Sequence, residues 1–320
     1  DLINNSSKKL DFRYLISLEK PKNTYQNPLD LPLKVLDFNE ENIKTICSDC
    51  DVLLFWGRVL DHVKYFSIKK VMWAHSDFNV NFFLEKAEEY ADHFIACSTN
   101  VKNAIKKKNC TVIFPGIDAS RYKNYSNFEV KKILGFEEKD FVIGLFCRFE
   151  KFKNIPFLIK SISSIKDLGV KVLLIGHGDE LSNVIKLCEE KIPKRFQYVY
   201  YSETESISFY YNCLDAFCLP SNGEGYARVQ WESAFFKVPF IGTNVGGVED
   251  GIINGHNGFV IREEKDLEAI VQKLKNQEYK KIIIKNAYDF FVKEGQIENT
   301  ALKVEKLFEK LIDNRKKLYV

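Results

Sequence analysis

The fold follows from one stretch of sequence, Pro220-Ser221-Asn222-Gly223-Glu224-Gly225-Tyr226-Ala227-Arg228-Val229-Gln230-Trp231-Glu232. An apolar run at 216–219 precedes it and is typical of a buried parallel strand. A second apolar run at 229–236 follows and predicts a helix. In an open α/β sheet, ligands bind where a strand hands over to a helix, so we expect the binding site here.

This junction combines backbone N–H groups with two carboxylates. The start of the predicted helix offers unpaired N–H groups and a partial positive charge, which suit a phosphate. Gly225 lets the backbone come close to such a ligand. Glu224 and Glu232 lie eight residues apart, which corresponds to about 12 Å along a helix. We therefore expect the two carboxylates to meet the two ends of an elongated anionic ligand that carries sugar hydroxyls.

Strands and helices alternate around this stretch, which predicts a parallel sheet with helices on both faces. The predicted strands are 141–146, 170–175, 197–201, 216–219, 240–242 and 258–261. The predicted helices are 155–168, 181–191, 207–213, 229–236 and 267–275. Residues 300–315 predict a further, amphipathic helix with Leu302, Leu307, Leu311 and Ile312 near one face.

Other motifs along the chain, taken in their order of occurrence, resemble those of a known protein family. They are Arg148 and Lys153, the turn Gly176-His177-Gly178-Asp179, the pair Pro220-Ser221, and Gly246-Gly247. With the Glu-x7-Glu pair, they resemble the retaining glycosyltransferases of the GT-B fold, group 1 (family 4). The resemblance covers residues 140–300 well and the first half of the chain poorly.

The resemblance implies an α/β fold of the GT-B type, with two Rossmann-like domains facing across a cleft. The implied enzyme moves a sugar from a nucleoside-diphosphate sugar to an acceptor hydroxyl, with retention of configuration, in glycan or polysaccharide assembly. The acceptor would be a glycan or a lipid-linked or protein-linked group. No metal or other cofactor is expected, because fixed cations would stabilise the leaving phosphate. Three alternatives remain open: a nucleotide-sugar epimerase of the same fold, a phosphorylase, and a non-catalytic nucleotide-sugar-binding protein.

The resemblance also implies catalytic roles for four residues. Glu224 would face the donor sugar, and Arg148 and Lys153 would hold its diphosphate. Surface exposure is the usual fate of such cations, but both follow a predicted parallel strand, where ligands bind. His75 follows the apolar run 70–74 and would line the donor site, although an ordinary loop histidine would look the same.

Substrate-binding roles follow in the same way. Glu232 would bind the ribose, and Gly176 would form part of the site. The phosphates would bind the backbone amides of Gly225, Tyr226, Ala227 and Arg228, and the nucleobase would lie near Tyr200, Tyr201 and Ser202. Two residues depart from the family pattern: Ala227 replaces a usual glycine and Arg228 a usual apolar residue. The tyrosines have an alternative role in packing.

Three segments are predicted along the chain. Residues 1–118 would form the acceptor-side domain, residues 119–300 the nucleotide-sugar-binding domain, and residues 301–320 a helix that crosses back onto the first domain. The linker is expected at about 115–138. No glycine precedes Gly57, so the glycine-rich turn that opens the family's first domain is either truncated or diverged.

Composition excludes several other classes of protein. The 320 residues are 45% hydrophobic and 28% charged, with a net charge of +3, which implies no nucleic-acid partner. No leader or membrane-spanning run is evident, so we expect a cytoplasmic protein with at most peripheral membrane contact. The eight cysteines are expected to be free thiols, and neither Cys47-Ser48-Asp49-Cys50 nor the DxD pattern 49–51 has the context of a metal site.

Overall fold

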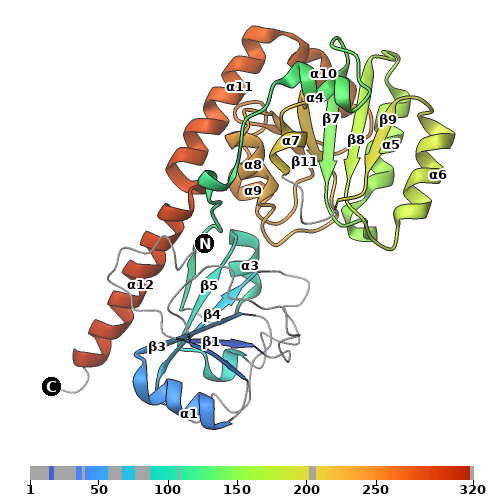
Figure 1. Ribbon diagram of the computed structural model, residues 1–320. Coiled ribbons are helices and arrows are strands. Elements are labelled where there is room, and N and C mark those ends of the chain that lie inside the picture. Colours follow the sequence, from blue (N-terminus) through green and yellow to red (C-terminus); the bar gives the residue numbers. More distant parts are fainter. Residues whose placement is uncertain are drawn as a thin grey trace. The chain divides into compact units, whose positions relative to one another are not determined.

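The computed structural model describes residues 14–17, 34–37, 40–56, 67–75, 87–106, 109–201 and 207–317. The chain divides into two compact units. The first comprises Asp1–Gly116 and Ile297–Val320, and the second comprises Ile117–Gln296. Each unit contains a parallel sheet (Figure 1), which confirms the predicted α/β class.

The second unit is built on a six-stranded parallel sheet in the order β12-β11-β10-β7-β8-β9. Its strands are β7 (Phe141–Phe146), β8 (Val170–Ile175), β9 (Phe196–Val199), β10 (Ala216–Leu219), β11 (Phe240–Gly242) and β12 (Phe259–Val260). Its α-helices are α4 (Asn127–Ile133), α5 (Ile155–Ser164), α6 (Leu181–Lys191), α7 (Ile207–Tyr211), α8 (Val229–Phe235), α9 (Val248–Gly251), α10 (Asp266–Lys275) and α11 (Gln277–Phe290). The short elements η2 (Ala119–Arg121) and η3 (Lys151–Lys153) and the π-helical η4 (Phe291–Gly295) complete it.

Two hydrophobic cores cover the two faces of this sheet. Alternate residues of a strand point to opposite faces, so Ile143 and Leu145 of β7 enter one core and Val142 and Phe146 enter the other. Helices α5, α6 and α10 pack against the first face, and α4 and α7 pack against the second. Burial on both faces explains why the strands read as continuous apolar runs.

The strand order reverses between β7 and β10. From β7 the chain proceeds outward through β8 and β9, then returns to β10 on the other side of β7 and proceeds to β11 and β12. The loops after β7 and β10 therefore diverge at the carboxyl edge of the sheet. Ligands of open α/β sheets bind at the topological switch point, where the strand order reverses. We therefore look for the site at the carboxyl ends of β7 and β10.

Asp215 directly precedes β10 and lies at the amino edge of this sheet, opposite the carboxyl edge. Its carboxylate accepts from Lys131 of α4 at 2.9 Å, from Lys280 of α11 at 3.1 Å and from the backbone N–H of Val142 at 3.1 Å. Burial alone would raise the pKa of this carboxyl, but the charges of Lys280 and Lys131 outweigh burial and hold the pKa below its ordinary value. Asp215 therefore links two helices to the sheet.

The first unit contains a four-stranded parallel sheet in the order β3-β4-β5-β6 and a separate parallel pair, β1-β2. Its strands are β1 (Tyr14–Ser17), β2 (Lys34–Asp37), β3 (Val52–Trp56), β4 (Lys69–Ala74), β5 (His93–Ala96) and β6 (Cys110–Val112). Its helices are α1 (Glu40–Asp49), α3 (Thr99–Ala104) and the C-terminal α12 (Ile297–Lys317). Val304, Leu307 and Phe308 of α12 pack against Val71 of β4 and Ile95 of β5.

Several local predictions were wrong. The segment expected as a linker contains α4, whose Val130 is buried in the second unit's core. Helix α5 ends at Ser164 rather than at residue 168, because Ile165 adopts an extended conformation. Of the face predicted for α12, Leu307 and Leu311 do pack in the first unit's core, but Leu302 is 45% exposed, and Val304 and Phe308 complete the buried face.

Two further observations concern the whole described chain. No helix within the described residues is both long and apolar enough to span a membrane. The seven cysteines whose side chains the structure describes are free thiols, and Cys97 and Cys218 are buried, as the sequence predicted.

We expect Asp215→Asn to destabilise the protein by about 3 kcal/mol at neutral pH, because it removes the charge that compensates two lysines. A carboxyl whose folded pKa is lowered stabilises the fold above its unfolded pKa and loses that effect as the pH falls through the folded pKa. The difference in the free energy of unfolding between the variant and the wild type should therefore stay constant around neutral pH and become smaller below pH 3.8. Denaturant unfolding at a series of pH values measures it.

Asp289→Asn is the matched control. Asp289 pairs with Lys285 at 2.7 Å, but both side chains are exposed, so the loss should stay within about 0.5 kcal/mol. Equal losses for the two variants would contradict a structural role for Asp215.

Candidate active site

The candidate site lies at the carboxyl edge of the second unit's sheet, at the switch point between β7 and β10. The loop after β10 contains Glu224, and the loop after β7 contains Lys153, the last residue of η3. Backbone contacts join the two loops, since the N–H of Asn222 donates to the carbonyl of Phe152 at 2.7 Å. The Asn154 side-chain amide donates to the Asn222 side chain at 3.2 Å. The two loops therefore form one surface.

Glu224 is the centre of this surface. Its Oε1 accepts from Lys153 Nζ and from Ser221 Oγ, each at 2.6 Å. The side chains of Glu224 and Lys153 are only 11% and 15% exposed, so their ion pair is shielded from water. Ser221 is fully buried, and its carbonyl accepts from Thr243 Oγ1 after β11. Groups from three strand ends thus fix this carboxylate.

Gly246 makes room for the Glu224 loop. Its φ is +51°, and a Cβ at this position would collide with the carbonyl oxygen of Glu224. The N–H of Gly247 donates to the carbonyl of Gly225 at 3.1 Å, and a Cβ on Gly247 would enter the Tyr226 ring. The Gly246-Gly247 pair is therefore required for a close backbone approach.

Arg148 occupies a more open position. It follows β7 by two residues, its side chain is 72% exposed, and its guanidinium pairs with Glu150 at 2.9 Å. The structure therefore pairs the two predicted phosphate-binding cations, Arg148 and Lys153, with different carboxylates. Arg148 can leave an exposed pair at little cost, because such pairs contribute about 0–1 kcal/mol.

Glu232 lies in the first turn of α8, and this helix does not extend back to Glu224. Helix α8 begins only at Val229, so the expected 12 Å helical separation of the two carboxylates was wrong. Glu232 Oε1 accepts from Tyr122 Oη at 3.2 Å, and its Oε2 accepts from Tyr211 Oη at 2.9 Å. Burial raises the pKa of Glu232, while these two hydrogen bonds and Arg228 oppose the rise.

The turn after β8 approaches the β7 loop closely. Gly176 has a φ of +144°, and a Cβ there would collide with the carbonyl of Cys147. The ring of His177 stacks on Tyr200 after β9, with centroids 5.4 Å apart and an angle of 24°. Tyr200 is 61% exposed, so the pair presents a flat aromatic face to solvent. Tyr201 instead packs against the core, in agreement with the alternative packing role considered for these tyrosines.

The residues between Gly225 and α8 differ in their surroundings. Tyr226 stacks on Trp231 at 5.7 Å, which is a packing role. Ala227 is buried, and its carbonyl accepts from the N–H of Gln230. Arg228 is exposed at the helix start, and its carbonyl accepts from the N–H groups of Trp231 and Glu232.

Two predicted residues do not belong to the described part of the second unit. His75 belongs to the first unit, where its exposed ring stacks on Trp73 at 5.3 Å. Ser202 lies outside the described residues. Within the second unit, the structure joins Lys153 to Glu224 directly and places Arg148, Gly176 and Tyr200 on loops at the same edge of the sheet.

Tyr122, Tyr211 and Ser221 were missed as site residues by the sequence reasoning. Ser221 was noticed only as part of the Pro220-Ser221 motif. Tyr122 and Tyr211 lie 110 and 21 residues from Glu232 in the chain, and a lone tyrosine in a loop or helix carries no signal of such a contact.

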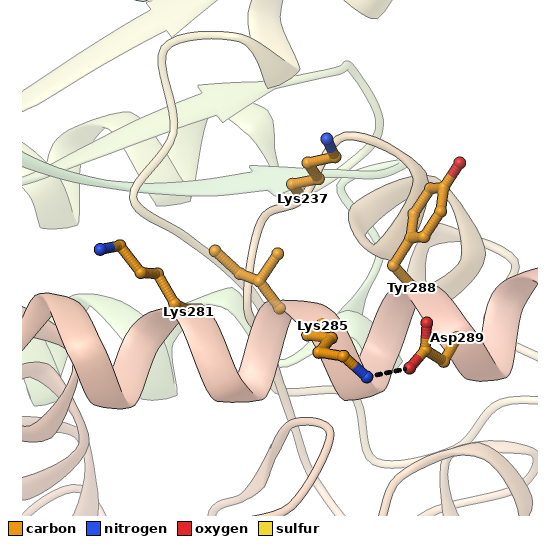
Figure 2. A pocket seen from close by; sticks show the side chains of 6 residues that line it. Lys237, Lys281, Lys285, Tyr288 and Asp289 are labelled. Carbon is orange, nitrogen blue, oxygen red and sulfur yellow. Dashed lines mark hydrogen bonds and ion pairs between the residues drawn. The ribbon is translucent and has the colours of Figure 1, made fainter.

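A separate surface hollow of about 480 Å³ lies beside α11 and shares no residue with the candidate site (Figure 2). It is lined by Lys237, Lys281, Ile284, Lys285, Tyr288 and Asp289. Its cations already have partners, since Lys281 pairs with Glu278, Lys285 pairs with Asp289, and Lys237 Nζ lies over the Tyr288 ring. Carboxylates thus neutralise two of these three cations.

Comparison with known sequences places these features in a family. Residues 126–290, about half of the chain, match the model described as glycosyl transferases group 1. The capsular polysaccharide biosynthesis glycosyltransferase CapM of Staphylococcus aureus is 30% identical over 213 residues, which are 61% of this chain and 54% of that protein. The N-acetyl-alpha-D-glucosaminyl L-malate synthase of Bacillus anthracis is 24% identical over 213 residues, 63% of this chain and 55% of that protein. The chain thus spans about half the length of these curated relatives.

Comparison with solved structures identifies the same fold. A glycosyltransferase from Rickettsia africae matches with a TM-score of 0.79 and 16% identity, covering 95% of this chain and 91% of that one. Anabaena Alr3699/HepE in complex with UDP matches with a TM-score of 0.76 and 17% identity, covering 87% and 86%. These likenesses confirm the GT-B architecture expected from the sequence.

We expect Gly246→Ala to lower the free energy of unfolding by more than a left-handed backbone alone explains. A non-glycine residue in the left-handed region costs about 1 kcal/mol, and here the new Cβ must also displace the carbonyl of Glu224. Gly255→Ala is the matched control, because Gly255 has a φ of +75° but its Cβ would lie 3.7 Å from the nearest atom, the Tyr279 hydroxyl. Denaturant unfolding of both variants tests this; equal losses would contradict the close approach.

Proposed function

The chain belongs to the group 1 glycosyl transferases, and from this premise we propose that it transfers a sugar from a nucleoside-diphosphate sugar to an acceptor hydroxyl. The anomeric configuration is retained, as in the family that the Glu-x7-Glu pair resembles. The observation that carries the proposal is the shielded Lys153–Glu224 pair at the β7/β10 switch point. A buried cation and carboxylate at that place suit a ligand with both a phosphate and hydroxyl groups.

The charges of the site fit the bond that must break. When a sugar–phosphate bond breaks, negative charge grows on the leaving phosphate, and nearby cations stabilise it. Lys153 lies 2.6 Å from Glu224, so its ammonium can exchange this carboxylate for a diphosphate while Glu224 turns to the sugar hydroxyls. Arg148 is exposed and only loosely paired, so it can move to the same diphosphate. No metal is needed in this scheme, which follows the family.

The two ends of the nucleotide have candidate partners on either side of the diphosphate. The exposed His177–Tyr200 stack offers a face on which a nucleobase can lie. Glu232 offers a carboxylate for the ribose. We propose uridine as the first base to test, because Anabaena HepE, a structural neighbour, was solved with UDP and with UDP-glucose.

The proposed acceptor side follows from a relative and from the resembled family. The name of CapM supports an acceptor that belongs to a growing polysaccharide, whether free, lipid-linked or protein-linked. We propose that residues 1–118 bind the acceptor and that His75 contributes to sugar binding, since both roles belong to the resembled family. The free thiols favour a reducing compartment such as the cytoplasm.

A panel of UDP-, GDP- and ADP-sugars tests the proposal directly. One base should raise the thermal unfolding midpoint, and its sugar nucleotides should be hydrolysed slowly in the absence of acceptor, with Glu224→Ala abolishing turnover. An epimerised product without acceptor would favour the epimerase, and a requirement for inorganic phosphate would favour a phosphorylase. Stabilisation without turnover would indicate a binding protein. Flat responses to all three bases would contradict nucleotide-sugar binding.

Arg148→Ala should lower donor turnover about tenfold or more, because charge on the leaving phosphate loses a partner. Its thermal midpoint should stay unchanged, because the side chain is 72% exposed. Lys265→Ala is the matched control: Lys265 pairs with Glu263 at 2.7 Å, also two residues away, and is 80% exposed. That variant should keep both turnover and stability. Equal turnover in the two variants would remove Arg148 from the site.

A further inference from the structure

Glu232 is held by two phenols, one on each of its oxygens. Tyr122 Oη donates to Oε1 at 3.2 Å, and Tyr211 Oη donates to Oε2 at 2.9 Å. Burial raises the pKa of both tyrosines, and the adjacent carboxylate raises it further. Both phenols therefore keep their protons at ordinary pH and act as donors.

Aromatic packing immobilises both phenol rings. Tyr211 is fully buried and stacks on Phe236 with centroids 4.9 Å apart and an angle of 6°. Tyr122 packs against Phe235 at 5.4 Å and edge-on against Phe236 at 5.4 Å. The cluster surrounds the end of α8, the helix that carries Glu232. The two donors are thus fixed before any ligand arrives.

A carboxylate has about four acceptor positions, two on each oxygen. Each phenol uses one, and the described residues supply no other side-chain hydrogen bond to Glu232. One position therefore remains on each oxygen. Two adjacent acceptors match a vicinal diol, in which each hydroxyl donates to a different oxygen.

We propose that Tyr122 and Tyr211 are positioning residues that orient the Glu232 carboxylate for bidentate binding of the ribose 2′- and 3′-hydroxyls, so that the chain selects ribonucleotides over 2′-deoxyribonucleotides. This inference rests on the proposed binding of a nucleoside diphosphate. Tyr122 precedes the sheet in the chain and Tyr211 belongs to α7, so residues from outside the Glu-x7-Glu motif set how its second glutamate binds.

Calorimetric titration of the intact chain with UDP, GDP and ADP, and with the matching 2′-deoxy diphosphates, tests the proposal. The wild type should bind one ribonucleotide about tenfold more tightly than its deoxy form, because a hydrogen bond to a charged acceptor is lost. Tyr122→Phe and Tyr211→Phe keep the rings but free the carboxylate. Each should weaken binding of the ribonucleotide about tenfold and binding of the deoxy form, which keeps its 3′-hydroxyl, by less, and so largely remove the preference.

Tyr125→Phe is the matched control. Tyr125 lies on the same segment as Tyr122, is 39% exposed, and contacts Phe209 through its ring, which phenylalanine retains. This variant should keep the preference for the ribose. Glu232→Gln provides a second route if a tyrosine variant does not fold, since an amide retains only one acceptor oxygen; it too should lose the preference.

Two outcomes would overturn the inference alone. An unchanged preference in Tyr122→Phe and Tyr211→Phe would show that the phenols serve only packing, and tighter ribonucleotide binding by Tyr122→Phe would show that Tyr122 competes with the ribose. If the wild type binds none of the three ribonucleotides, the proposed function itself fails and the inference fails with it.

Discussion

The ion pair between Lys153 and Glu224 joins the two loops that diverge from the centre of the second sheet. At a switch point, consecutive strands leave in opposite directions, and the loops above them have no common helix to hold them together. Here a shielded ion pair, the Ser221 hydroxyl and the Asn222–Phe152 backbone contact provide that connection. The remaining features of the site, including the two glycines opposite Glu224, are arranged around this junction.

The second unit could be predicted closely from the sequence, because its strands are buried on both faces. Strands β7, β8, β10 and β11 begin and end where their apolar runs do. The first unit was harder. Helix α1 has only three apolar residues, Ile43, Ile46 and Cys47, so its periodic pattern extends over little more than one turn and is a weak signal. The sequence predicts a linker at about 115–138 and misses α4, because Val130 is the one apolar residue of this helix that is buried, and the core it enters is formed by distant strands.

The sequence could place single residues at the ends of strands, but it could not show which of them pair. The order of motifs indicated Glu224, Lys153 and Arg148, but not that Glu224 would hold Lys153 while Arg148 pairs with Glu150. The spacing of Glu224 and Glu232 suggested a continuous helix, whereas the loop remains irregular up to Arg228. Contacts between residues 71 or 110 positions apart depend on how strands are ordered, and local sequence does not encode that order.

The Asp215 bridge has a consequence for how this sheet can change over time. Its lysine partners secure α4 and α11 at one rim, while the loops that carry Glu224, Gly176 and Tyr200 project from the other. The contacts that stabilise the sheet and the loops that carry the candidate site thus lie at opposite edges of it. Loops at the site's edge can be exchanged or lengthened without loosening the anchor beneath them, which gives a lineage of such proteins freedom to acquire new sugars while it keeps one framework.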